Sequence, residues 1–139
     1  MAKAGPSEGN LASHREASRP ARLHAVWFDE ITQILTGQRL YVETNRKHGT
    51  RANLSAADLR ECDLSGKVLR RIKLDHALLW NANLAHANLQ RANLIGADLR
   101  GACMTGTDLE DARISGANLE AANLEGAVLI GADLEFAAM

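Results

Sequence analysis

From Ala52 to Met139 the sequence repeats itself every five residues, and this period limits the possible folds more than any other feature. The centre of each unit is a bulky aliphatic residue. Of the 18 centres, 15 are Leu, running from Leu54 to Leu134, and the others are Met104, Ile114 and Met139. Ala stands two residues before the centre in 14 units, and Asn or Asp stands directly before it in 11 units. A repeat this regular predicts one continuous architecture for nearly two thirds of the chain.

A period of five fits neither a helix nor a straight strand. In an α-helix, a step of five residues rotates the centre by about 140°, which would spread the Leu side chains around the whole cylinder. In a straight strand, an odd step sends successive centres to opposite faces. The chain must therefore turn once in each unit, so that every centre points into one interior. Seven glycines lie two residues after a centre, where a bend is needed, and Asn and Asp can bond the nearby backbone. The pattern predicts a solenoid with Leu filling its bore.

Units such as Ala92-Asn93-Leu94-Ile95-Gly96 and Ala97-Asp98-Leu99-Arg100-Gly101 resemble the A-(D/N)-L-x-x repeat of the pentapeptide-repeat family. The resemblance covers residues 52–139. It implies an all-β fold, a right-handed quadrilateral β-helix with four units, or 20 residues, in each coil. Outer residues that are 20 apart in the sequence would then form columns, with about 4.8 Å between neighbours.

Three segments precede the predicted β-helix. Residues 1–20 are rich in Pro, Gly, Ser and charge, and we expect a disordered leader. Residues 21–37 are predicted to form an N-terminal capping helix with Gly37 at its end, because apolar residues follow helical spacing there: Leu23, Val26, Trp27, Ile31, Ile34 and Leu35. The open first coil of a solenoid needs such a cover, although a partner-binding helix is the alternative. Residues 38–51 lead into the repeats, and the stretch from Gln38 to Leu59 resembles the lead-in of bacterial pentapeptide-repeat proteins.

Composition and spacing argue against several classes of protein. The sequence shows no signal peptide and no apolar run long enough to cross a membrane, so we expect a cytoplasmic protein. Cys62 and Cys103 give no disulfide framework. His76 and His86 are ten residues apart, which places them on opposite faces of a four-sided coil, where they cannot share a metal. Ser55, Ser65 and Ser115 are turn-region residues without a base in register, and the glycines recur as turn elements. The sequence therefore predicts no cofactor, no metal and no enzymatic activity.

One outer column stands out as a candidate contact surface. Stacking in steps of 20 places Arg60, Trp80, Arg100 and Glu120 one above another. Trp80 between two guanidinium groups could form a structural cation–π ladder. An exposed Trp is also a natural contact residue for a protein partner, and the sequence leaves both interpretations open.

The repeat is irregular around Lys67, which occupies a position where the other units bury a small residue. Burying an unpaired amine is costly, so either the coil bulges there or the Lys67 side chain extends outward. Together with Arg70, Arg71 and Lys73 it forms a basic cluster. The cluster is either a set of solvated charges on an irregular coil or a patch that binds an anion or an acidic protein. It has no interleaved aromatic residues, and direct nucleic-acid binding is not expected.

The C-terminal coils differ in charge from the rest of the chain. Residues 101–139 carry seven acidic residues and one basic residue, Arg113. The sequence ends inside a unit, with Phe136 near the end and Met139 at a centre. We expect either homodimer formation through this end or closure of the bore by Phe136 and Met139. Repulsion between two acidic ends argues against the dimer.

These features favour a non-catalytic protein-interaction or scaffold module with an unidentified protein partner. The family resemblance implies an alternative, a DNA mimic that binds DNA gyrase in the manner of quinolone-resistance proteins. The basic cluster, the small number of coils and the lack of a C-terminal dimerisation helix are departures from that type. A structural self-assembly element is the third hypothesis.

Overall fold

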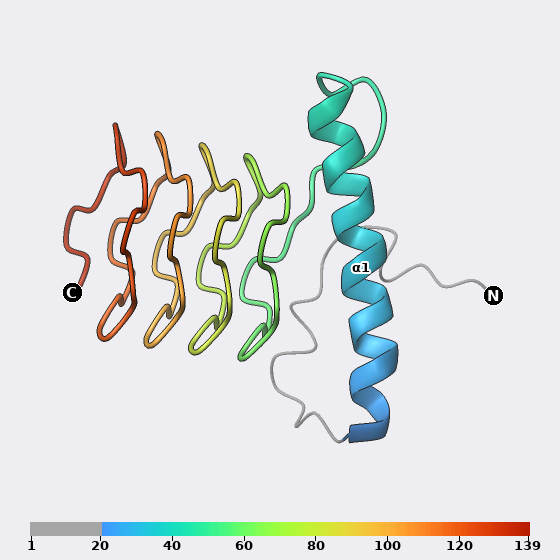
Figure 1. Ribbon diagram of the computed structural model, residues 1–139. Helices are drawn as coiled ribbons and strands as arrows, with labels where there is room; N and C mark the ends of the chain where they lie inside the picture. The colour runs from blue at the N-terminus through green and yellow to red at the C-terminus, as the bar shows by residue number, and fades with distance from the viewer. Residues whose placement is uncertain (1–20) are drawn as a thin grey trace.

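The computed structural model describes the backbone of residues 21–139 and the side chains of residues 31–139. The repeats wind into a stack of coils, and helix α1, Ala21–Glu43, lies across the N-terminal end of that stack (Figure 1). The predictions for residues 1–20, and for the side chains of Leu23, Val26 and Trp27, fall outside the described residues. No helix within residues 21–139 has the length and apolar character needed to span a membrane.

Parallel backbone pairing joins residues that are 20 positions apart, from Asn53 with Lys73 to Asn118 with Ala138. Around each bridge the hydrogen bonds alternate in direction. The N–H of Leu74 donates to the carbonyl of Asn93 at 2.8 Å, and the N–H of Asn93 donates to the carbonyl of Ile72 at 2.9 Å. A register of 20 with a period of five means four units per coil. The pairing consists of isolated bridges, one in each unit, and not of long strands.

The four faces are numbered here along the first coil, by the residue directly before each centre. Face 1 contains Asn53, face 2 Asp58, face 3 Asp63 and face 4 Val68. Each face continues upward in steps of 20 residues, so that face 2 consists of the units around residues 58, 78, 98, 118 and 138. This register assigns every outer side chain to a face and to a coil.

A tight turn between successive faces closes each unit. At each of the 17 corners the N–H three residues after the centre donates to the carbonyl of the centre, as Ala57 does to Leu54 at 3.1 Å. The residue two after the centre has positive φ at all 17 corners from Ala56 to Phe136, with values between 58° and 72°. These features define a type II turn. Only seven corners are Gly, so residues such as His76 and Arg91 accept a left-handed conformation that costs about 1–2 kcal/mol in an L-residue.

The Asn or Asp before the centre stabilises the same turn. In each of the 11 units that have one, its Oδ1 accepts a hydrogen bond from the backbone N–H two residues later, as in the 3.1 Å bond from Ile95 to Asn93. Within the described part of the chain, no carbonyl of a neighbouring coil accepts a hydrogen bond from this N–H. The preference for Asn and Asp therefore has a local cause, the side-chain bond that prepares the turn.

The bore is filled by the centres and by the small residues two positions before them. From Leu54 to Leu119 every centre is at most 3% exposed, and the Ala residues beside them are at most 1% exposed. Thr107 replaces one of these Ala residues, and its hydroxyl donates to the carbonyl of Leu84 at 2.8 Å, which satisfies the buried group. Burial of each Leu contributes about 1.5–3 kcal/mol, so stacked aliphatic layers provide the core.

Helix α1 packs on the first coil. Ile31, Ile34 and Leu35 are buried in the same cluster as the bore. Gln38, also fully buried, donates from Nε2 to the carbonyl of Arg70, and its Oε1 accepts from the N–H of Ala52 at 2.7 Å. These are two backbone groups at the start of the solenoid. The sequence placed the end of this helix at Gly37, but the helix continues to Glu43. The continuation is what brings Gln38, one turn after Ile34 on the buried side, onto the coil.

The irregular position at Lys67 does not distort the coil. Val68 pairs with Asn88, and the N–H of Asn88 donates to the carbonyl of Lys67 at 2.9 Å, as in the regular units. The Lys67 side chain is exposed. It lines a cleft of about 230 Å³ between α1 and the first coil, together with Leu35 and Arg39. The coil therefore does not bulge at Lys67. Instead, the Lys67 side chain extends outward.

Candidate interaction surface on face 2

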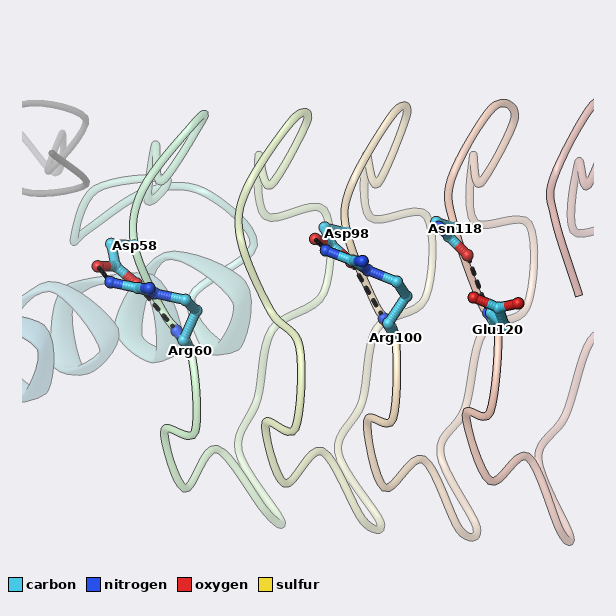
Figure 2. A network of polar contacts seen from close by, with 6 residues as sticks. All are labelled: Asp58, Arg60, Asp98, Arg100, Asn118 and Glu120. Atoms are coloured by element: carbon cyan, nitrogen blue, oxygen red, sulfur yellow. Dashed lines mark hydrogen bonds and ion pairs between the residues drawn. The ribbon is translucent and has the colours of Figure 1, made fainter.

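The outer residues of face 2 combine charge, an aromatic ring and a shallow groove. The position directly after the centre is occupied in successive coils by Arg60, Trp80, Arg100 and Glu120. The repeat holds the backbone of all four in one conformation, so their side chains leave the coil from equivalent places. Figure 2 shows this equivalence for three of them, each beside the Asp or Asn two residues earlier.

Arg60 and Arg100 are each fixed by an acidic residue of their own unit. Arg100 donates from Nε to Oδ1 of Asp98 at 2.8 Å and from Nη2 to Oδ2 at 2.6 Å (Figure 2). Arg60 makes the same two bonds to Asp58, at 2.7 and 2.6 Å. Such paired bonds hold the planar guanidinium in a defined orientation. The face therefore presents its cations in fixed positions.

These bonds also set the protonation of the groups. The hydrogen bond from Arg100 holds the pKa of the Asp98 carboxyl below its usual range, against the opposing effect of burial. The hydrogen bonds to Asp58 and Asp98 raise the pKa of Arg60 and of Arg100, respectively. The Asp98–Arg100 pair is therefore ionised at neutral pH. In the next coil Asn118 replaces the acid, and its Oδ1 accepts only the N–H of Glu120, at 3.0 Å.

Trp80 contacts one of the two predicted cations. The guanidinium carbon of Arg60 lies 5.6 Å from the centre of the Trp80 ring, within the range of a cation–π interaction. Among the described residues, the only such contact in this column is that of Arg60. Arg100, on the other side, is held by Asp98. The ladder is thus present below Trp80 and does not extend to Arg100 above it.

Above Trp80 the surface is hollowed into an open groove of about 540 Å³, which crosses three coils at the corner between faces 2 and 3. Its lining is formed by Trp80, Asn81, Arg100, Gly101, Glu120 and Ala121. Gly101 gives the groove its floor, and the Asn81 side chain lies over it. The groove therefore offers an aromatic wall, a fixed cation, a carboxylate and a small apolar floor.

The other predicted contact residues do not join this surface, and they do not form one patch. Lys67 lines the cleft beside α1, and Lys73 lies on face 1. Arg70 and Arg71 are brought together at the corner between faces 4 and 1, in a separate pocket. Sequence reasoning did not include Asn81 in the groove, although its place next to Trp80 at a corner was a usable signal.

At the C-terminal end, Phe136 is 86% exposed and Met139 is 71% exposed. Neither side chain covers the bore, and the centres of the last coil are less buried than those of the coils before it. Association through this end stays a prediction. Within residues 31–139, whose side chains the structure describes, no group of three or more His, Cys, Asp or Glu could hold a metal ion.

Comparison with known proteins agrees with the fold. The pentapeptide-repeat family model matches in eight copies, over residues 52–77, 72–111 and 107–139. No significant match was found among curated proteins.

Three solved structures are similar. HetL, a pentapeptide repeat protein involved in heterocyst differentiation regulation in Nostoc sp. strain PCC 7120, shares 43% identity over 56% of this chain and 35% of its own length, with a TM-score of 0.48. Rfr23 from Cyanothece 51142 shares 38% identity over 63% of this chain and 60% of its own, with a TM-score of 0.46. The protein alr5209 from Nostoc PCC 7120 shares 33% identity over 73% of this chain and 75% of its own, with a TM-score of 0.49.

The chain spans about a third of the length of HetL and three fifths of that of Rfr23. Proteins built from these repeats form right-handed β-helices. With a family model that matches every unit from residue 52 to residue 139, the chain belongs to the pentapeptide-repeat family.

Proposed function

We propose that this protein is a non-catalytic interaction module whose face 2 binds a segment of a partner protein. The observation that carries the proposal is the groove beside Trp80. It is the place where an aromatic ring, a fixed Arg100–Asp98 pair and the Glu120 carboxylate line one hollow. The regular interior supports the same conclusion, because it uses the centres and the Ala positions for packing. Only the outer residues are left to recognise a partner.

The chemistry of the groove indicates what it binds. Trp80 and the floor at Gly101 and Ala121 favour an apolar or aromatic side chain, since aromatic residues in packed grooves dominate binding energy. Arg100 above Trp80 suits a carboxylate or a backbone carbonyl, and Glu120 suits a basic side chain. An extended segment that runs across the coils would meet these groups in that order. The fixed backbone lowers the entropy cost of such binding.

The proposal is tested by affinity capture of partners from the native cell with the full chain as bait. Trp80→Ala is the variant, and Ile130→Ala is the matched control. Ile130 occupies the same position of the repeat on face 4, and it is 70% exposed. We expect at least one protein that is captured by the wild type and the control and is lost with Trp80→Ala. If every captured protein is retained by Trp80→Ala, face 2 is not the binding surface.

A further inference from the structure

A second pocket, separate from face 2, lies where the C-terminal end of α1 meets the corner between faces 4 and 1. Figure 1 shows the chain leaving this end of the helix and returning to the first coil. The pocket has a volume of about 200 Å³. It is lined by Tyr41, Val42, Asn45, Arg46, Arg70, Arg71 and Arg91. Four of these seven residues are Arg, and none is acidic.

The arginines come from three separate parts of the fold. Arg46 belongs to the turn after the helix, and Arg70 and Arg71 belong to the first coil. Arg91 occupies the same corner as Arg71 one coil later, and both have positive φ, 64° for Arg71 and 58° for Arg91. The register of 20 residues therefore places the positive charges of Arg71 and Arg91 on neighbouring coils. Such stacking is unfavourable unless an anion lies between or beside them.

The walls of the pocket are held by hydrogen bonds. The carbonyl of Arg70 accepts from Gln38 of α1, and the carbonyl of Arg71 accepts from Nε of Arg51 at 2.6 Å. A hydrogen bond also ends helix α1. The N–H of Arg46 donates to the carbonyl of Tyr41 at 2.7 Å. This bond occupies a terminal carbonyl that would otherwise repel an anion.

The charge of the pocket is poorly compensated. Nε of Arg70 is buried and has no hydrogen-bond partner among the residues that the structure describes. Asp111 is the acid nearest in register, and its Oδ2 lies 3.8 Å from Nε of Arg91, with both side chains half exposed. This ion pair is weak and involves only one of the four arginines. Among the described residues, the guanidinium of Arg70 is therefore left with an unpaired N–H donor.

We propose that this arginine pocket, formed by Arg46, Arg70, Arg71 and Arg91, binds a small phosphate compound with at least two negative charges, of the diphosphate type. Arginines that line one pocket from three segments suit a tetrahedral oxyanion with oxygens on several sides, whereas a planar carboxylate is satisfied by one or two guanidiniums in its plane. A nucleic-acid strand would need cations spread along a track with stacking aromatics. Here the four arginines line one pocket.

The test is calorimetric titration of the full chain with sodium diphosphate and with inorganic phosphate at about 0.15 M salt, where surface charges are screened. We expect diphosphate to bind more tightly than phosphate. Arg71→Gln should weaken diphosphate binding at least about tenfold, because each variant removes a charge-assisted hydrogen bond. Arg46→Gln should weaken diphosphate binding to a similar extent. Because Arg46 lies outside the repeats, this variant can still be measured if Arg71→Gln does not fold.

Arg113→Gln is the matched control, since Arg113 is an exposed arginine of face 1 outside the pocket. We expect its affinity for diphosphate to stay within twofold of the wild type. Three results would overturn the proposal. These are no binding at millimolar diphosphate, an equal loss with Arg113→Gln, and citrate or a short single-stranded oligonucleotide binding as tightly as diphosphate through the same arginines. Partner capture through Trp80 is measured in a separate experiment. A negative result with diphosphate therefore does not contradict the proposal that face 2 binds a partner.

Discussion

Oδ1 of Asp98 accepts two hydrogen bonds from Arg100, one from its backbone N–H at 3.3 Å and one from its side-chain Nε at 2.8 Å (Figure 2). One atom thus prepares the turn and also fixes the cation that the turn carries. Asn118, one coil later, does only the first of these, because Glu120 follows it. The Asn or Asp before the centre therefore has two separate roles, to stabilise the turn and to fix a neighbouring cation.

The two uses can be separated by substitution. Asp98→Asn retains an Oδ1 for the turn and removes the charge, and we expect it to lower the free energy of unfolding by about 0.2–1 kcal/mol, because Arg100 is half exposed. Asp98→Ala also leaves the N–H of Arg100 without its side-chain acceptor. It should cost about 0.5–1.5 kcal/mol more. Urea unfolding at pH 7 measures both, and equal losses would contradict the separation.

The same pair predicts a dependence on pH. Arg100 lowers the pKa of Asp98 in the folded state relative to an unfolded value of about 3.9. The stabilisation is therefore fully present above that value, and it is lost as the pH falls through the lowered folded pKa. We expect the difference in unfolding free energy between wild type and Asp98→Asn to shrink when the pH is lowered from 7 toward 2. A constant difference would show that the charge of Asp98 does not contribute.

Two corner glycines with the same backbone conformation predict different tolerance of a side chain. Gly96 and Gly116 have φ values of 67° and 69°. A Cβ at Gly96 would lie 2.5 Å from Nδ1 of His76, whereas a Cβ at Gly116 would meet nothing within 4 Å. Gly116→Ala should cost about 1–2 kcal/mol for the left-handed conformation alone. Gly96→Ala should cost a further ~0.5–1.5 kcal/mol, since the imidazole must leave its rotamer.

The extra cost at Gly96 should disappear in a His76→Ala background, which removes the ring and keeps the backbone. Thermal unfolding of the two single variants and the double variant gives the interaction energy. If the cost of Gly96→Ala is the same with and without His76, the clash is not its cause.

Gln38 is predicted to hold the helix on the solenoid. Gln38→Ala leaves the N–H of Ala52 and the carbonyl of Arg70 without the partners that they have in the fold, and we expect a loss of about 1–3 kcal/mol. Gln33→Ala, on the exposed side of the same helix, should change stability by less than about 0.5 kcal/mol. Urea unfolding compares the two, and equal effects would show that Gln38 does not fasten the helix.

Much of this fold could be predicted from the sequence because one physical rule governs every unit. A centre such as Leu89 must enter the bore, and the 20-residue register then places Arg60 below Trp80. The limits of the prediction lie where the rule stops. Arg46 lies outside the repeat, so no register could bring it to Arg71 and Arg91. Gln38 was not expected in the core, because a polar residue becomes buried only where the opposing backbone offers it partners.

The corners also show what the sequence pattern does not reveal. Seven glycines indicated bends, but the left-handed conformation occurs equally at residues such as His76, where the repeat geometry overrides the residue's own preference. Similarly, the sequence left open a cation–π ladder with a guanidinium on each side of Trp80. Among the described residues only Arg60 lies over the ring, although Arg60 and Arg100 make the same two hydrogen bonds to an Asp of their own unit.

The central claim is that Trp80 and the groove beside it carry partner recognition. It is tested most directly by the Kd of a captured partner for wild type, Trp80→Ala and Ile130→Ala, with thermal unfolding of each variant as the check on folding. We predict that Trp80→Ala weakens binding by about 30-fold or more without loss of the fold, as expected for a buried aromatic contact, and that Ile130→Ala stays within twofold. Equal Kd values for Trp80→Ala and wild type would contradict the claim.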